Sequence, residues 1–226
     1  MSKRTILLAY VLPFALFMAG LVVVTGFRYL GVTHFGGLTL DPMYWIYPIQ
    51  TVVCAAVLLW FWRAYDFSGT TVVNLLMGAG VGVLIFGLWI APQEVFHQPR
   101  RMEGFDPQVI PMMSFWMLTA RFARLVLLVP LVEEFFWRGF LLRYLVKDDF
   151  TSLPFGSSSK FSFWAVVVAF VAVHATIDWP AAFITGILLN LVATRTRSLA
   201  ACVTAHAVAN LGLGLYICTT RQWGFW

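Results

Sequence analysis

Charged side chains are scarce in this sequence. Asp, Glu, Lys and Arg make up only 11% of the 226 residues, whereas an average soluble domain has about 25%. Apolar residues account for 61% of the chain, and the mean hydropathy is +0.83. These values exclude a soluble globular domain, a disordered chain and a nucleic-acid-binding module. They predict an integral membrane protein in contact with the lipid bilayer.

Cysteine is also rare, and Cys54, Cys202 and Cys218 all lie in apolar runs. The sequence therefore has neither a disulfide framework nor a C-x-x-C metal site. The net charge of +5 and the pI of 9.4 come from fifteen basic residues spread between the apolar runs. This distribution is typical of the loops of a membrane protein and does not indicate a nucleic-acid partner.

Long apolar runs predict an all-α, polytopic transmembrane helix bundle with about seven to eight spans. Residues 1–226 are expected to form a single integral membrane domain. The first run, of 23 residues, is longer than the apolar region of a signal peptide, so it is expected to be an uncleaved span. The fourth run is too long for one simple span, and Pro130 is expected to kink or divide it. The runs cover residues 5–27, 44–62, 71–91, 113–146, 161–178, 180–194 and 199–218.

Basic residues between the runs predict the orientation of the chain. With the N-terminus inside, the inner segments hold eight cations: Lys3, Arg4, Arg63, Arg143, Lys147, Lys160, Arg195 and Arg197. The outer segments then hold four: Arg28, Arg100, Arg101 and Arg221. The positive-inside rule therefore favours a cytoplasmic N-terminus. Arg121 and Arg124 lie within the fourth run, where they are expected to line an interface or to snorkel.

The two halves of the chain differ in their content of motifs and ionisable residues. Residues 5–112 hold no motif for a chemical site, and their Gly78 and Gly82 form a G-x-x-x-G pair that predicts close helix packing. Residues 113–218 are expected to form the catalytic core helices, because ionisable side chains interrupt the apolar runs there. A charged side chain at the centre of a span costs about 2.5–3.5 kcal/mol, so such residues point to function.

Three runs bring these polar residues to similar depths. Glu133 and His174 each lie 13 residues from the predicted inner end of their helix, or about 20 Å along it. His206 lies seven residues from Leu199, or about 10 Å, and Asn210 lies one turn deeper. The four side chains are therefore expected to share one layer inside the bilayer.

Helical spacing adds partners to this layer. Glu134 and Arg138 are four residues apart, as are His206 and Asn210, so the members of each pair project from the same face. Glu133 points about 100° away from Glu134. One carboxylate can therefore pair with arginine while the other faces a cavity, where it could act as a base toward water.

The same residues fit three motifs in order on successive apolar runs. Residues 133–138 read E-E-x-x-x-R, residues 170–174 read F-x-x-x-H, and residues 206–210 read H-x-x-x-N. This set resembles the CPBP family of intramembrane proteases, which includes the CAAX prenyl endopeptidases and the bacteriocin-processing and immunity proteins. The aromatic pattern of residues 44–62 is also similar to that of bacterial CAAX-prenyl-protease-related proteins that accompany exosortase systems.

The resemblance implies a metal-free glutamic-type endopeptidase in which Glu133 is the general base and His174 holds and polarises the attacking water. It implies that His206 and Asn210 stabilise the oxyanion, while Glu134 and Arg138 brace the site. The implied substrate is a membrane-embedded or lipidated peptide or protein. The implied location is the bacterial inner membrane.

Three alternatives remain open at this point. A zinc-dependent protease could use Glu133, His174 and His206 as ligands around an open position, although the H-E-x-x-H motif is absent. A membrane immunity or peptide-binding protein could keep the same pocket without catalysis. A transporter could use these groups as a proton relay, but the sequence lacks an inverted repeat with paired broken helices.

Overall fold

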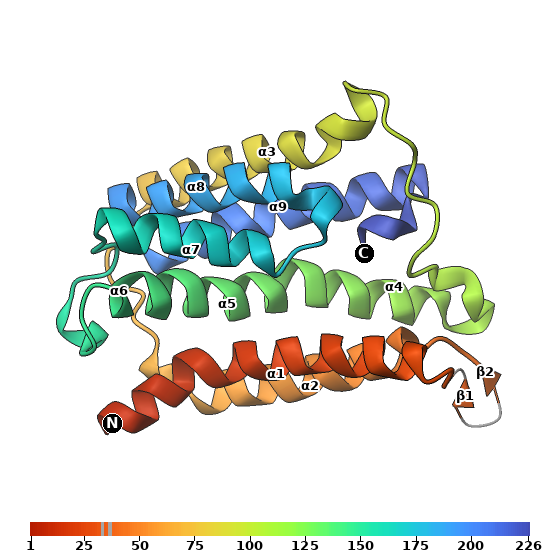
Figure 1. Cartoon of the computed structure of the whole chain (residues 1–226), viewed down its shortest axis with the longest axis horizontal. Coiled ribbons are helices and arrows are strands. Elements are labelled where there is room, and N and C mark those ends of the chain that lie inside the picture. Colours follow the sequence, from red (N-terminus) through yellow and green to blue (C-terminus); the bar gives the residue numbers. More distant parts are fainter. Residues whose placement is uncertain (33, 36–37) are drawn as a thin grey trace.

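The computed structural model describes residues 1–32, 34–35 and 38–226, which form a helix bundle with one short strand pair (Figure 1). The α-helices are α1 (Lys3–Tyr29), α2 (Met43–Trp60), α3 (Val72–Glu94), α4 (Ser114–Ala123), α5 (Val129–Glu134), α6 (Leu142–Tyr144), α7 (Lys160–Ala172), α8 (Trp179–Thr196) and α9 (Leu199–Thr220). Two π-helical segments are η4 (Arg124–Leu128) and η5 (Phe135–Leu141). Short 3₁₀ turns are η1 (Trp62–Ala64), η2 (Pro107–Val109), η3 (Pro111–Met113), η6 (Phe150–Ser152), η7 (Thr176–Asp178) and η8 (Trp223–Phe225). Strands β1 (His34–Phe35) and β2 (Leu38–Thr39) pair antiparallel beyond the end of α1.

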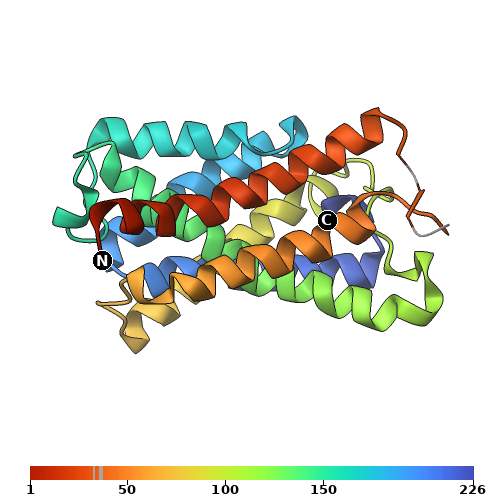
Figure 2. The same cartoon turned by 90° about the horizontal axis from the view of Figure 1, so that it is seen from below.

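Six helical stretches of the described residues are long and apolar enough to cross a membrane: Lys3–Tyr29, Met43–Trp60, Val72–Glu94, Pro111–Tyr144, Thr176–Thr196 and Leu199–Thr220. The predicted all-α polytopic bundle is thus confirmed. Large apolar side chains such as Val52, Leu76 and Val168 face outward on it, each more than 60% exposed. Figure 2 shows the helices from below, with their axes running broadly along the same direction.

The predicted fifth span, over residues 161–178, is wrong in its length. Helix α7 ends at Ala172 after 13 residues, which is too short for a span, and the chain turns through residues 173–178 before α8 begins. Pro180 lies in the first turn of α8, where a proline can start a helix but could not continue one from α7. His174 therefore lies in this turn and not inside a helix, as the sequence had suggested.

The long fourth run forms one continuous helical stretch, from η3 to α6, and Pro130 does not divide it (Figure 1). Segment η4 ends just before Pro130, and the N–H of Val129 bonds to the carbonyl of Arg124, five residues back. A π-helical turn re-routes backbone bonds locally, so the helix passes a residue that has no N–H. The motif residues 133–138 begin at the end of α5, with Glu133 and Glu134, and continue into η5, which holds Arg138.

Helix α3 packs directly on α9, as the G-x-x-x-G pair predicted. A Cβ atom on Gly78 would collide with the carbonyl oxygen of Ala201, and one on Gly82 would collide with that of Ala205. Two helices approach this closely only where one of them lacks side chains. The contact places the backbone of α3 against the helix that carries His206.

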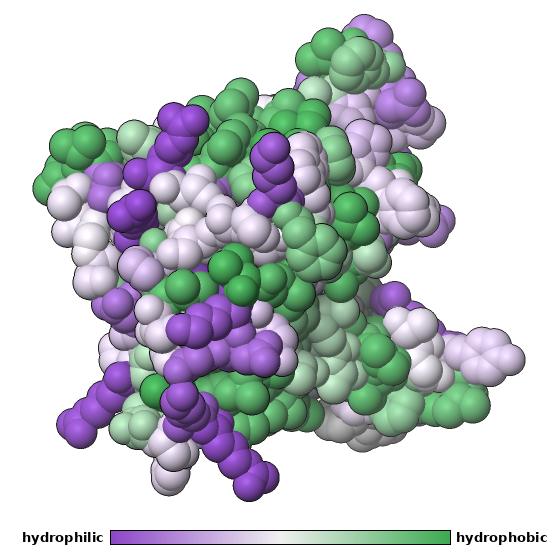
Figure 3. Space-filling model, turned by 60° about the vertical axis from the view of Figure 1, so that its left-hand side comes forward, coloured by the Kyte–Doolittle hydropathy of each residue, from purple (hydrophilic) through white to green (hydrophobic). Residues whose placement is uncertain are grey.

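The segments predicted to be inner lie together at one end of the bundle. The N-terminus, the loops 61–71 and 145–159 and the turn between α8 and α9 all lie on the left of Figure 1. Figure 3 brings that end forward and shows hydrophilic side chains gathered on it, with hydrophobic ones along the flank. All eight cations counted as inner belong to these segments or to the adjoining helix ends.

Candidate active site

Glu133 lies on α5 and lines a buried cavity of about 150 Å³. The residue is 8% exposed, and its Oε2 atom is buried with no hydrogen-bond partner among the described residues. An unpartnered carboxylate oxygen is costly in a low-dielectric interior unless it meets a proton donor. The cavity has room for several water molecules, since one water needs roughly 10–15 Å³ by this measure.

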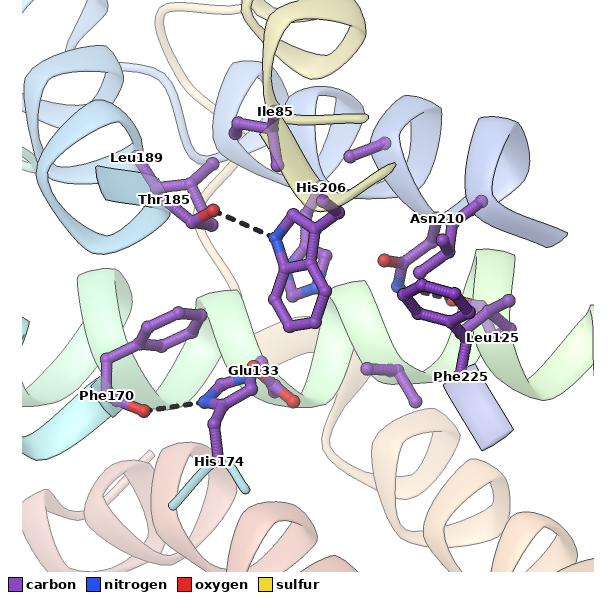
Figure 4. Close-up of a pocket in the computed structure, with 14 residues that line it drawn as sticks. Ile85, Leu125, Glu133, Phe170, His174, Thr185, Leu189, His206, Asn210 and Phe225 are labelled. Carbon is purple, nitrogen blue, oxygen red and sulfur yellow. Dashed lines mark hydrogen bonds between the residues drawn. The ribbon is translucent and has the colours of Figure 1, made fainter. Parts of the chain in front are cut away.

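His174 enters the same cavity from the turn after α7. Its Nδ1–H donates a 2.7 Å hydrogen bond to the carbonyl of Phe170, one turn earlier. Because a carbonyl only accepts, this bond places the proton of a neutral ring on Nδ1 and leaves Nε2 as an acceptor. Figure 4 draws the ring beside the Glu133 carboxylate. Two proton acceptors therefore line one small cavity.

Glu134 and Arg138 form the predicted ion pair on the other side of the helix. Arg138 donates to Glu134 Oε1 at 3.0 Å and to Oε2 at 3.2 Å, and both side chains are completely buried. The same guanidinium donates to Asn190 Oδ1 at 3.0 Å, and Asn190 in turn donates to the carbonyl of Phe163. The pair thus ties the motif helix to α8 and α7.

His206 on α9 joins this brace directly. Its Nδ1–H donates to Glu134 Oε1 at 2.8 Å, and the ring lines the cavity. A ring held this way presents a second N–H to the cavity only as the imidazolium cation.

Asn210 lines the cavity one turn along α9 from His206. Its Nδ2 group donates a 2.8 Å hydrogen bond to the carbonyl of Leu125 in η4. A side-chain amide has two N–H donors, so one N–H remains for the cavity. Glu133, His174, His206 and Asn210 are thus all brought to one cavity, and their catalytic roles stay a prediction.

Several residues of the site were missed by the sequence reasoning. Trp89 on α3 and Thr185 on α8 form a 3.0 Å hydrogen bond at the cavity wall (Figure 4). Asn190, which holds Arg138, was also missed, although an amide inside an apolar run was a usable signal. Phe225, from the C-terminal turn, carried no signal because it reaches the cavity only through the tertiary fold.

The loop after α3 and the C-terminal turn meet at Phe225, which lines the cavity. Arg101 pairs with Asp178 at 2.6 Å and lies over the ring of Phe225, with 4.3 Å between its Cζ and the ring centroid. The N–H of Gly224 also donates to the carbonyl of Arg101. The loop after α3 thereby fixes both the start of α8 and the C-terminal turn.

The zinc alternative needs Glu133, His174 and His206 to meet around one point. Across residues 1–32, 34–35 and 38–226, no group of three or more His, Cys, Asp or Glu side chains is arranged to hold a metal ion. His206 Nδ1 and His174 Nδ1 are both bonded to protein acceptors, and this leaves the Nε2 atom of each ring for water or for a metal ion.

The fold and the cavity together define an integral membrane protein with a cavity that glutamate and histidine side chains line. Residues 114–212 match the family described as type II CAAX prenyl endopeptidase Rce1-like. The match covers 99 of the 226 residues and includes all three motifs, so this part of the chain is similar to the CAAX prenyl endopeptidase (CPBP) family, which supports an intramembrane peptidase. No curated protein and no solved structure matches the chain significantly.

Proposed function

We propose that this protein hydrolyses a peptide bond in a membrane-embedded protein or a lipidated C-terminal tail, with Glu133 as the general base. The observation that carries the proposal is the buried, unpartnered Oε2 of Glu133 in a cavity that also holds His174, His206 and Asn210. A base needs its proton donor within hydrogen-bond reach in a site that excludes bulk water. A water held beside Glu133 Oε2 would meet the first condition, and the low exposure of Glu133, 8%, supports the second.

Before the reaction, one water donates a hydrogen bond to each of two acceptors, Glu133 Oε2 and His174 Nε2. The bond from His174 Nδ1 to Phe170 supports this role, since it leaves Nε2 free to accept. The water oxygen then attacks the carbonyl carbon of the substrate, and its proton passes to Glu133. His174 orients the water and needs no change in its own protonation.

The carbonyl oxygen gains negative charge as the water attacks, and donors aimed at it stabilise the transition state. The second N–H of Asn210 is one such donor, held in place by the bond to Leu125. The imidazolium form of His206 is the other, held by Glu134. Glu133 then returns its proton to the leaving amine nitrogen as the C–N bond breaks, which releases a carboxylic acid and an amine.

We also propose that the N-terminus is cytoplasmic and that the membrane is a bacterial inner membrane. The gathering of eight cations at the end of the bundle that holds the N-terminus supports this orientation. The reaction as written uses protein groups and water and needs no metal ion.

The test is a cleavage assay with purified protein in detergent. Its substrate is an internally quenched peptide with a prenylated cysteine, two aliphatic residues and a free C-terminal residue. Glu133→Gln keeps shape and hydrogen bonding but removes the base, so we expect the rate to fall about 10²–10⁴-fold. The matched control is Glu103→Gln, the same chemical change at an exposed loop position, which should cleave normally.

Two outcomes would contradict the proposal in different ways. Wild-type rates in Glu133→Gln would show that another group is the base, and Glu134 would be examined next. A wild-type protein that binds the peptide without cleaving it would favour the immunity or peptide-binding alternative.

A further inference from the structure

Two arginines inside the helix bundle have no acidic partner. Arg121 and Arg124 lie one turn apart on the helix that carries Glu133, and neither forms an ion pair within the described part of the chain. Arg124 is only 5% exposed. Buried charges in proteins are normally paired, because removing a charge from water is costly. These two cations therefore lack the counter-charge that such a location calls for.

Aromatic rings and neutral acceptors fix the two guanidinium groups. Arg124 lies over the rings of Tyr47 and Phe17, at 4.3 and 4.9 Å from their centroids, and donates to Gln50 Oε1. Arg121 lies 5.2 Å from the centroid of Tyr47 and 5.1 Å from that of Phe105. Stacking on a ring face orients a guanidinium but leaves its edge donors free.

Free donors are present on Arg121. Its Nε and Nη1 atoms are buried and have no hydrogen-bond partner among the described residues. The Nε–H and the Nη1–H lie on different edges of the guanidinium, and each can donate a charge-assisted hydrogen bond to an oxygen of a carboxylate or phosphate. Both arginines line a cavity of about 310 Å³.

This second cavity adjoins the candidate active site. Leu125, Val129 and Phe225 line both cavities. Arg124 and Glu133 are nine residues apart on one continuous helix, or about 13 Å. An extended peptide spans about 3.3–3.6 Å per residue, so roughly four residues separate the two sites. A peptide that reaches Glu133 can therefore place its C-terminus at the arginines.

We propose that Arg121 and Arg124 form an oxyanion-binding site that holds the C-terminal carboxylate of the peptide substrate. This inference rests on the proposed function for the identity of its ligand. The arginines are binding and specificity residues that position the chain end and do not touch the reacting bond. The other source of a suitable oxyanion is the phosphate of a lipid headgroup, and the adjoining active site favours the peptide.

The test compares two forms of the quenched peptide described above, one with a free C-terminal carboxylate and one with a C-terminal carboxamide. Charge-assisted bonds are the strong ones, so wild-type protein should prefer the acid by about tenfold or more in kcat/KM. In Arg121→Gln and Arg124→Gln the acid-to-amide ratio should approach one, and Arg124→Lys should keep part of it. Arg63→Gln, an exposed arginine in the loop after α2, is the matched control and should retain the full ratio.

A binding assay separates this inference from the proposed function. Fluorescence anisotropy with the Glu133→Gln protein measures the preference in binding for the acid over the amide without catalysis. If this protein prefers the acid while wild-type protein cleaves neither peptide, the carboxylate site is supported and only the protease mechanism is refuted. Equal binding and cleavage of the two peptides by wild-type protein refutes the carboxylate site, even if the arginine variants fail to fold. A third outcome would also overturn the proposal. The two peptides bind equally, and phosphatidylglycerol, unlike phosphatidylcholine, raises the melting temperature of the wild-type protein but not that of Arg121→Gln. The site would then bind lipid phosphate.

Discussion

Replacing Arg138 tests how much the buried Glu134–Arg138 ion pair stabilises the protein. It is fully buried, contacts both oxygens of Glu134, and donates to Asn190 and to the carbonyl of Gly186. Replacing it with Met keeps much of the apolar stem but removes every donor. Glu134 would then keep only the bond from His206, and Asn190 Oδ1 would lose its partner.

The size of the effect follows from these contacts. Removing one partner of a buried ion pair typically costs about 3–5 kcal/mol, because the other charge is left uncompensated. For a chain of this length that corresponds to a fall of about 10 °C in melting temperature. Activity should fall as well, because Glu134 positions the ring of His206.

A double-mutant cycle in detergent makes the test specific. Melting is measured for Arg138→Met, Glu134→Gln and the double variant. If the loss comes from an unpaired buried charge, the double variant should be more stable than Arg138→Met alone. Melting of Arg138→Met at the wild-type temperature, or strictly additive losses, would refute the reasoning and assign Arg138 a role toward substrate.

Three further predictions concern other parts of the site. Asn210→Ala should lower the cleavage rate about 10²–10³-fold through loss of an oxyanion donor, and should lower stability by about 1 kcal/mol because the Leu125 carbonyl loses its partner; normal cleavage in a folded variant would exclude the oxyanion role. Gly82→Val should destabilise the bundle strongly, because any side chain there collides with the backbone of Ala205. The control, Gly80→Val, places its side chain in open space and should melt near the wild-type temperature. Similar melting of the two variants would contradict the packing argument. Treatment with 1,10-phenanthroline or EDTA should leave cleavage unchanged, and loss of activity restored by zinc would revive the metal alternative with Glu133 as a ligand.

Much of the fold and part of the site could be predicted from local sequence patterns. Apolar runs located the spans because a spanning helix must be long and apolar whatever its neighbours are. The Glu134–Arg138 pair followed from the four-residue spacing, which survives even though η5 is π-helical. The three motifs pointed to the family that the match over residues 114–212 supports.

The sequence by itself determined that the chain is a membrane helix bundle, and it singled out Glu133, His174, His206 and Asn210 as polar residues within apolar runs, since composition and helical spacing are properties of the chain alone. Only the tertiary structure decided that α7 stops before His174, that His206 bonds to Glu134, and that Asn210 holds the carbonyl of Leu125. It also decided that Arg121 and Arg124 lie among aromatic rings without an acidic partner. The physical reason is that these contacts depend on how each helix is rotated and how closely it packs on helices far away in sequence, which local periodicity does not encode.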